Sequence, residues 1–284
     1  MMDRRQVGTV QFEIEAPRPI RWKPEDGGFV CGGAAGRICC VRVTEADAVM
    51  EPGEPVYTEP GFSVFRQSDG TEIRTCRAAF LGQKVPYARS ICTPDGVEIE
   101  FVTASGVWEN PNFSFWSLLH LENHLLDAGG LILHCCYLMH DGGAILFTAP
   151  SGTGKTTQGK LWERVYGAEI INGDRALLQR DPGGWLAMGY PFHGSAPECR
   201  NESCPVRGIV VVRQAEEDRV ERLSPAEAMI LLYEGITVNV WDRQRSTQAL
   251  DLLQELITAV PVVRLNCTMR ESAAETLHRY FYGG

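Results

Sequence analysis

The sequence contains no run of 18 apolar residues and no signal-peptide core after its opening Met-Met-Asp-Arg-Arg-Gln. We therefore expect neither a membrane-spanning helix nor secretion, and we expect a cytoplasmic protein. Positive charge is also scarce, since 27 Lys and Arg stand against 36 Asp and Glu, a net charge of -9. Because nucleic-acid binding needs a basic face, we expect no nucleic-acid partner. Because no apolar run is long enough to cross a bilayer, we expect no membrane partner either. Repeats and low-complexity segments are absent too, and 284 residues with 44% hydrophobic content can build one large domain or two smaller ones.

The ten cysteines would suggest disulfides in a small secreted chain, but the length and the missing signal predict reduced thiols. Two Cys-Cys pairs lie in the apolar runs 38–41 and 131–137, where buried packing is the favoured role. Cys199 and Cys204 lie in a polar segment instead. Two thiolates cannot complete a tetrahedral zinc site alone, and His193 could supply a third ligand. Zinc binding and a redox pair stay open for these two cysteines, with packing favoured.

The first hundred residues have the pattern of short strands. Residues 10–15 alternate between apolar and polar side chains. Residues 62–66 return as 72–76 across an Asp-Gly turn, and residues 97–102 follow the turn signal Pro94-Asp95-Gly96. We expect residues 1–110 to form an antiparallel, β-rich N-terminal region. Its motifs indicate no chemistry, and recognition of an acceptor or partner is left open for it.

A helical pattern begins at Pro111 and predicts a core helix that ends at Gly129-Gly130. Its apolar face consists of Phe113, Phe115, Trp116, Leu118, Leu119, Leu121, Leu125 and Leu126. His120 and His124 are spaced i and i+4, which suits a metal on one helix face, but without a third ligand core or solvent-facing histidines are favoured. We assign residues 111–284 to a second domain.

The remaining elements predict a mixed α/β domain. Capping boxes at Ser224 and Ser272 predict two helix starts. A further predicted helix ends at residue 166, before Gly167, and another spans about 246–259. The predicted strands are 131–138, 144–148, 170–172, 176–180, 185–188, 206–213 and 262–265.

Residues 149–157 read Ala-Pro-Ser-Gly-Thr-Gly-Lys-Thr-Thr between a predicted strand and a predicted helix, as in a phosphate-binding loop, although Ala149 stands where the usual fingerprint has Gly. Its glycines let backbone N–H groups point at phosphate oxygens, and the helix N-terminus adds its positive dipole end. Lys155 would neutralise the β and γ phosphates, and the Thr156 hydroxyl would bind Mg²⁺. The predicted ligands are ATP and Mg²⁺, with Mn²⁺ as an alternative metal, and a chance glycine-rich turn is the competing interpretation. The predicted ATP-binding residues are Ser151, Gly152, Thr153, Gly154, Lys155, Thr156 and Thr157.

A second metal-binding carboxylate usually ends a strand that neighbours the loop strand. Asp174 follows the predicted strand 170–172 and lies 19 residues after Lys155, so it is the candidate. A surface turn in which Asp174 pairs with Arg175 is the alternative.

Three segments together resemble the kinase core shared by bacterial HPr kinase/phosphorylases and ATP-dependent phosphoenolpyruvate carboxykinases. They are Leu-His-Cys-Cys-Tyr at 133–137, Pro-Ser-Gly-Thr-Gly-Lys-Thr-Thr at 150–157, and Ile-Asn-Gly-Asp-Arg at 171–175. The resemblance covers about residues 130–215 and implies an α/β P-loop kinase domain of that type, after a β-rich N-terminal region that has no counterpart of the HPr kinase N-terminal domain. It also implies that Asp174 is the metal-binding aspartate and that His134 lies beside the metal and the transferred phosphoryl group.

One residue departs from this pattern, because Gly173 stands where HPr kinases carry the aspartate that accepts the seryl proton. His193 is the candidate substitute, since an imidazole titrates near neutral pH, and Asp174 could also act through its metal. Phosphoryl transfer depends mostly on positioning and electrostatics, so loss of this aspartate need not abolish activity.

The resemblance implies an ATP-dependent kinase that phosphorylates a hydroxyl, on a serine of a peptide or small protein or on a small metabolite. The alternatives are a nucleotide-binding regulatory or peptide-binding protein with reduced catalysis and, third, a carboxykinase-like lyase. HPr kinases form oligomers, which leaves a homo-oligomer open here, and no sequence feature adds to it.

Overall fold

The structure is a computed structural model that describes residues 1–32, 36–194 and 198–283. It divides into two compact units, Met1–His124 and Leu125–Gly284. The division falls later than residue 110, so the start of the segment assigned to the second domain lies in unit 1. No helix in the described ranges has both the length and the apolar character needed to cross a membrane.

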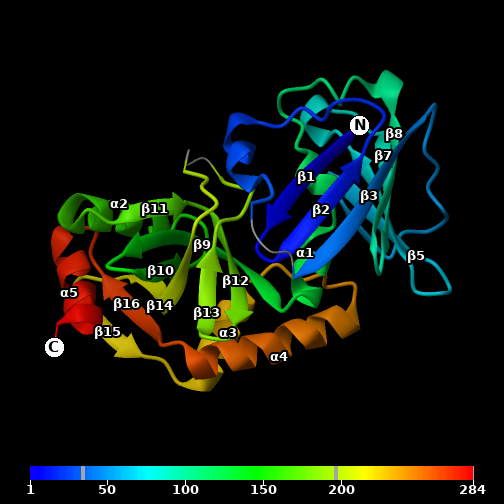
Figure 1. Ribbon diagram of the computed structural model, residues 1–284. Coiled ribbons are helices and arrows are strands. Elements are labelled where there is room, and N and C mark those ends of the chain that lie inside the picture. The colour runs from blue at the N-terminus through cyan, green and yellow to red at the C-terminus, as the bar shows by residue number, and fades with distance from the viewer. Residues whose placement is uncertain (33–35, 195–197, 284) are drawn as a thin grey trace. The chain divides into compact units, whose positions relative to one another are not determined.

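Unit 1 contains an eight-stranded sheet with the strand order β1-β2-β3-β8-β7-β6-β5-β4 (Figure 1). The expected hairpins β5–β6 and β7–β8 are present and antiparallel. The expectation of a wholly antiparallel region is wrong, because β3 runs parallel to both β2 and β8. A long crossover, not a hairpin, joins β2 to β3, and such a connection lets consecutive strands run in one direction. The strands are β1 (Met2–Val7), β2 (Val10–Glu15), β3 (Arg37–Ala46), β4 (Tyr57–Glu59), β5 (Phe62–Arg66), β6 (Glu72–Arg77), β7 (Pro86–Thr93) and β8 (Gly96–Val102), with short 3₁₀ helices η1 (Pro24–Phe29), η2 (Ala79–Leu81) and η3 (Thr103–Ser105).

The predicted helix after Pro111 is broken at His120. It forms a 3₁₀ helix, η4 (Phe115–Leu118), and a short α-helix, α1 (Leu121–Asp127). The backbone φ of His120 is 48°, a left-handed conformation that a helix interior excludes. The eight apolar residues of the predicted face are nevertheless all buried, so the pattern located the core correctly and missed the break.

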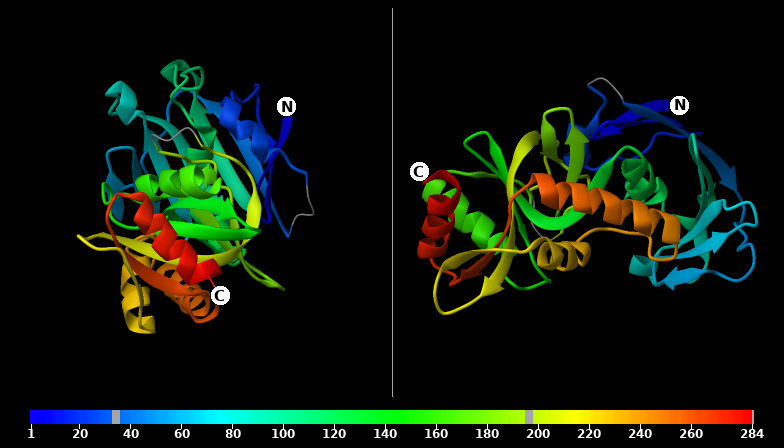
Figure 2. Two further views of the ribbon diagram at one scale, coloured as in Figure 1. Left: turned by 90° about the vertical axis from the view of Figure 1, so that its left-hand side faces the viewer. Right: turned by 90° about the horizontal axis from the view of Figure 1, so that it is seen from below.

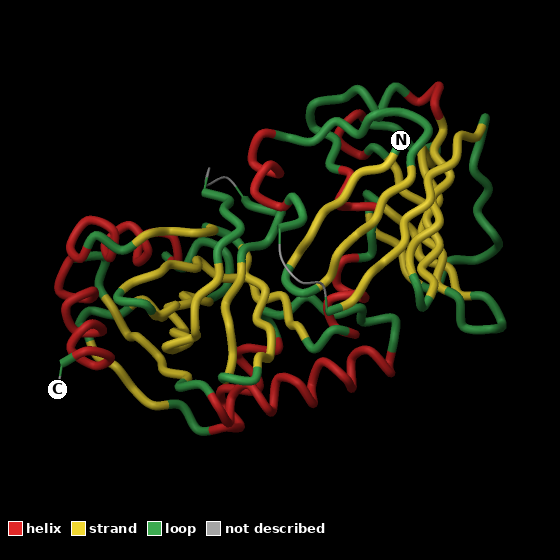
Figure 3. The backbone as a smooth tube through the Cα atoms, in the orientation of Figure 1, coloured by secondary structure: helices red, strands yellow, loops and turns green. Residues whose placement is uncertain are grey.

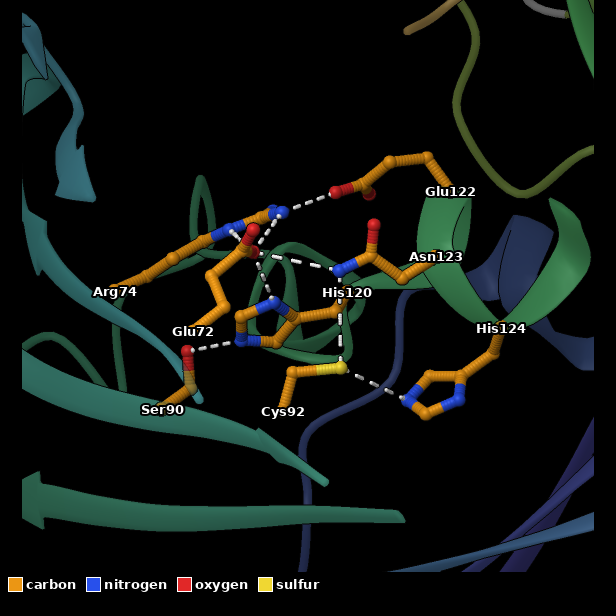
Figure 4. Close-up of polar contacts among 8 residues, drawn as sticks. All are labelled: Glu72, Arg74, Ser90, Cys92, His120, Glu122, Asn123 and His124. Carbon is orange, nitrogen blue, oxygen red and sulfur yellow. Dashed lines mark hydrogen bonds and ion pairs between the residues drawn. The ribbon is translucent and has the colours of Figure 1, made fainter. Parts of the chain in front are cut away.

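The His120 ring enters a buried polar network in unit 1 (Figure 4). Its Nδ1 lies 3.1 Å from Glu72 Oε1, and its Nε2 lies 2.8 Å from Ser90 Oγ. Glu72 also pairs with Arg74 at 2.6 Å, and Arg74 pairs with Glu122. Burial, and after it the charge of Arg74, lowers the pKa of His120, which keeps the ring neutral.

His124 is likewise a core histidine. Its Nε2 lies 3.8 Å from Cys92 Sγ (Figure 4), and both histidine residues are 1% exposed. Among the residues that the structure describes, no group of three or more His, Cys, Asp or Glu could hold a metal ion. The metal alternative for this histidine pair therefore has no support.

Unit 2 is an α/β domain whose β9, β10, β14, β13 and β12 pair in a closed ring. Helices α2 and α5 pack on one face of its sheet, over a core that includes Phe147 and Trp162. Helices α3 and α4 pack on the other face (Figures 2 and 3), where the core includes Leu146 of β10 and Leu253 of α4. The helices are α2 (Lys155–Tyr166), α3 (Pro225–Tyr233), α4 (Arg243–Ala259) and α5 (Glu271–Tyr282), and the strands are β9 (Gly130–His140), β10 (Gly143–Thr148), β11 (Glu169–Asn172), β12 (Arg175–Asp181), β13 (Gly184–Met188), β14 (Ser203–Gln214), β15 (Arg219–Arg222) and β16 (Val262–Cys267).

Two of the three predicted helix starts in this unit need correction. The Ser224 capping box of α3 is confirmed. Helix α4 begins at Arg243 and not at 246, because the Asp242 side chain accepts a hydrogen bond from Arg245 N and caps the helix there. The Ser272 box is wrong, because α5 has Arg270 as its N-cap and the Ser272 hydroxyl bonds to Asp218 instead.

None of the ten cysteines, all of which lie in the described ranges, forms a disulfide. Buried packing is confirmed for three of the four paired residues, but Cys40 is exposed, because alternate residues of β3 point to opposite faces. Cys204 is buried in the core of unit 2, and Cys199 is half-buried with its Sγ 3.5 Å from the Tyr190 carbonyl. Packing and local bonding therefore account for both, and no metal cluster includes them in the described ranges.

The lowered pKa of His120 predicts a pH-dependent stability. In the unfolded chain this histidine takes up a proton below about pH 6.5, whereas the native ring resists it until a lower pH. The free energy of unfolding should therefore fall as the pH drops from 7.5 to 5.5, by up to about 1.4 kcal/mol per pH unit from this group. Urea unfolding of the wild type and of His120→Asn measures this, since Asn also tolerates the left-handed backbone. The variant should be less stable at pH 7.5 and should lose stability less steeply on acidification. Parallel pH profiles would contradict the assignment.

Candidate functional site

The predicted phosphate loop joins β10 to α2, and two of its glycines have backbone angles that other residues rarely adopt. Gly152 has φ 78° and Gly154 has φ 113°, both in the region where a Cβ is strained. Gly154 is also the N-cap of α2, so the first helical N–H groups open onto the loop. Ala149 does not have a positive φ, so its methyl group causes no strain in place of the usual glycine. The local sequence therefore fits the loop conformation throughout.

An open cavity of about 330 Å³ lies over this loop. Most of the predicted site residues line it, and Thr153 and His193 are not among the described lining residues. Gly173 and Gly194, which bring backbone to the cavity, were not predicted as ligands. The lining residues are His134, Ser151, Gly152, Gly154, Lys155, Thr156, Thr157, Gly173, Asp174 and Gly194.

Strand β9 brings His134 and Asp174 to the loop, because it lies between β10 and β12 and pairs with one along each edge. His134 pairs with Arg175 on β12, and the next residue, Cys135, pairs with Thr148 at the end of β10. Cys135 N donates to Asp174 O at 2.9 Å, and Thr148 Oγ1 donates to His134 O at 2.9 Å. His134 Nε2 lies 3.5 Å from Asp174 Oδ1. Residues far apart in sequence thus meet where the loop begins.

The strand before Asp174 is not the neighbour of the loop strand, which corrects the sequence expectation. Strand β11 pairs with β9, and β9 lies between β11 and β10. Asp174 therefore reaches the cavity from one strand farther away, through the turn that contains Gly173.

One buried amide, Asn172, fixes that turn and was missed by the sequence analysis. Its Oδ1 accepts from Asp174 N at 2.8 Å and from Arg175 N at 2.9 Å. Its Nδ2 donates to Tyr190 O at 2.9 Å and to Phe192 O at 3.0 Å. Asn172 is 0% exposed, so no water replaces these bonds. An Asn two residues before the candidate carboxylate is the signal for an Asx turn that could have revealed it.

The segment that Asn172 holds places Gly194 against Asp174. A Cβ built on Gly194 would lie 3.1 Å from Asp174 Oδ1, so any larger side chain would press on the carboxylate. His193 is half-buried between Phe192 and Gly194. Gly194 brings its backbone to the cavity, and the role of His193 stays a prediction. Gly173 lines the cavity as well and offers no side chain there.

The charges in the cavity favour an ionised carboxylate. The hydrogen bond from His134 lowers the pKa of Asp174, with further lowering by Arg175, His134 and Lys155, and burial opposes this. Burial lowers the pKa of Lys155, whose Nζ donates to Ala149 O at 2.9 Å. An ionised carboxylate and an ammonium group thus occupy the same cavity.

The donor atoms fit the predicted metal. The Thr156 hydroxyl and the Asp174 carboxylate both line the cavity, and Mg²⁺ prefers oxygen ligands, using one or two carboxylates together with substrate phosphates. Thr156 and Asp174 would hold the ion, and Mn²⁺ suits the same donors.

A family model described as SynChlorMet cassette protein ScmC matches residues 113–281. The chain belongs to the ScmC family. The ScmC match includes the phosphate loop, His134 and Asp174, so every residue of the candidate site lies in the part that this chain shares with its family. All eight strands of the unit 1 sheet lie outside the match.

The other comparisons add little. No curated protein matches this ScmC chain. Among solved structures, the Hpr(Ser) kinase/phosphatase from Coxiella burnetii is similar with a TM-score of 0.32 and 11% identity, over 54% of this chain and 93% of that chain. A TM-score this low does not establish a common fold, so we draw nothing about activity from it.

The Asn172 bonds predict a local effect of a nearly isosteric change. Asn172→Asp keeps an acceptor for Asp174 N and Arg175 N but loses both donors to the 190–192 carbonyls, which costs about 1–3 kcal/mol per unsatisfied buried group. Hydrogen exchange at the amides of 190–194 should become faster, while exchange in α2 stays unchanged. The exposed Asn112→Asp is the matched control. Unaltered exchange at 190–194 would show that Asn172 does not hold this segment.

Proposed function

We propose that this ScmC-family chain is an ATP-dependent kinase that transfers the γ-phosphoryl group to a hydroxyl, on a serine of a peptide or protein or on a small metabolite. The observation that carries the proposal is the single cavity lined by the phosphate-loop backbone, Lys155, Thr156 and Asp174. The loop motif and the resemblance of the 133–137 and 171–175 segments to the HPr kinase core support it as well.

The phosphate-binding and charged groups of the cavity have separate roles in this proposal. The loop N–H groups and the α2 N-terminus bind the phosphates, and Lys155 neutralises them. Mg²⁺, held by Thr156 and Asp174, would offset negative charge on the phosphates. Asp174 also orients His134 through their 3.5 Å contact.

The acceptor hydroxyl oxygen forms a bond to the γ-phosphorus while the bond to the β–γ bridging oxygen breaks, and ADP leaves with that electron pair. The hydroxyl proton needs an acceptor, because Gly173 has no side chain. We assign this role to His134, which lines the cavity with a 36% exposed side chain. His193, the sequence candidate, is the competing assignment.

Gly173, which lacks a side chain, also favours a second function. If no group replaces the missing carboxylate, the chain would bind ATP and regulate a partner without phosphorylating anything.

The kinase proposal predicts phosphate transfer that depends on the cavity charges. Intact-mass measurement with serine peptides and small hydroxyl compounds should detect a phosphorylated product with Mg-ATP. Lys155→Ala should weaken ATP binding about 10–100-fold through a lost charge-assisted bond, whereas Lys160→Ala, an exposed position on the same helix, should not. Asp174→Asn should reduce transfer by about 100-fold or more.

Three outcomes decide between the kinase and the regulatory function and test the roles of Asp174, His134 and His193. ATP binding without any transfer favours the regulatory function, and transfer unaffected by Asp174→Asn removes this residue from the mechanism. A loss of transfer in His193→Ala but not in His134→Ala would reassign the proton acceptor.

A further inference from the structure

The phosphate loop has a second wall, formed by segments that follow β14 and β16. Strands β10, β14 and β16 are parallel neighbours, so their carboxyl ends meet at one edge of the sheet. The loop leaves β10 there, and Gln214, the last residue of β14, donates from its Nε2 to Thr153 O at 3.2 Å. Residues 268–270, which follow β16, lie at the same edge and bring Met269 against the loop.

Met269 packs directly on the loop. A Cβ built on Gly154 would lie 2.4 Å from Met269 Cε and 3.1 Å from its Sδ, so the thioether lies on the backbone where α2 begins. The residue is still 40% exposed, which leaves apolar surface available beside the phosphate-binding backbone. An exposed methionine is a polarisable, adaptable surface that packs well against aromatic rings.

Hydrogen bonds to Gln158 and to Asp218 hold residues 268–270, which carry Met269, in place. Gln158, buried on α2, donates to Thr268 O at 3.2 Å. Asp218 accepts from Thr268 N at 2.6 Å and from Thr268 Oγ1 at 3.2 Å, and it also accepts from the Ser272 hydroxyl. Residues 268–270 are therefore positioned by the carboxylate of Asp218, which does not line the cavity.

The order of the strands gives a bound triphosphate a direction. His134 and Asp174 lie on the β9 and β12 side of the loop, and Met269 lies on the β16 side, with β10 and β14 between. A terminal phosphate beside Asp174 therefore leaves the nucleoside to extend toward Met269.

We propose that Met269 is an apolar platform for the nucleobase of the bound nucleoside triphosphate, and that Asp218 positions it by bracing residues 268–272. This inference rests on the proposed nucleotide site and adds its base-binding side. The predicted contact is stacking of the base on the thioether, without base-specific hydrogen bonds.

Binding of two Mg²⁺-loaded probes separates this inference from the proposed function. Isothermal titration calorimetry compares ATP, which has a base, with inorganic tripolyphosphate, which has none. Wild type should bind ATP more tightly than tripolyphosphate. Met269→Ala should weaken ATP binding about 5–10-fold and leave tripolyphosphate binding unchanged. Met269→Leu should restore most of the ATP affinity, and Met50→Ala, a 74% exposed methionine of unit 1, should match wild type.

Asp218→Ala tests the brace, since it should weaken ATP binding in the same selective way. Equal weakening of both probes by Met269→Ala, or no weakening of either, overturns the platform while the phosphate site stands. Wild type that binds ATP no more tightly than tripolyphosphate also overturns the platform. Wild type that binds neither probe overturns the nucleotide site and the platform together.

Discussion

The candidate site depends on four hydrogen bonds of one buried side chain, Asn172. Its oxygen fixes the turn that presents Asp174, and its amide nitrogen holds the 190–192 carbonyls, which brings Gly194 to the same carboxylate. Since Asn172 is fully buried, each lost bond would leave an unsatisfied group at about 1–3 kcal/mol. The carboxylate side of the cavity is therefore set by one residue that takes no part in the proposed chemistry.

Features encoded by neighbouring residues could be predicted from the sequence. The glycines of 149–157 require positive φ, the helix after them begins at Lys155, and Ser224 caps α3 as its capping box predicts. The hairpins of unit 1 follow from turn residues and alternation in the same way. The meeting of His134 and Asp174 at the loop follows less directly, from the resemblance of three separate segments to a kinase core.

Features set by contacts distant in sequence could not be predicted. The break at His120 follows from a bond to Glu72, 48 residues earlier, which outweighs the helical pattern. The parallel placement of β3 depends on its crossover path, and no local pattern encodes it. Met269 reaches Gly154 only because β10, β14 and β16 are parallel neighbours. The backbone of Gly194 reaches the cavity only through the bonds of Asn172 to residues 190 and 192, and His193 stays a prediction.

The most direct test of this account is a crystal structure with Mn²⁺ and an ATP analogue whose γ-phosphate cannot be transferred, because anomalous scattering locates the metal independently of the protein. We expect one manganese peak between Thr156 Oγ1 and the Asp174 carboxylate, with the triphosphate along residues 151–157 and the base on Met269. Manganese and triphosphate bound elsewhere, or a triphosphate on the loop with its terminal phosphate directed away from Asp174, would contradict it.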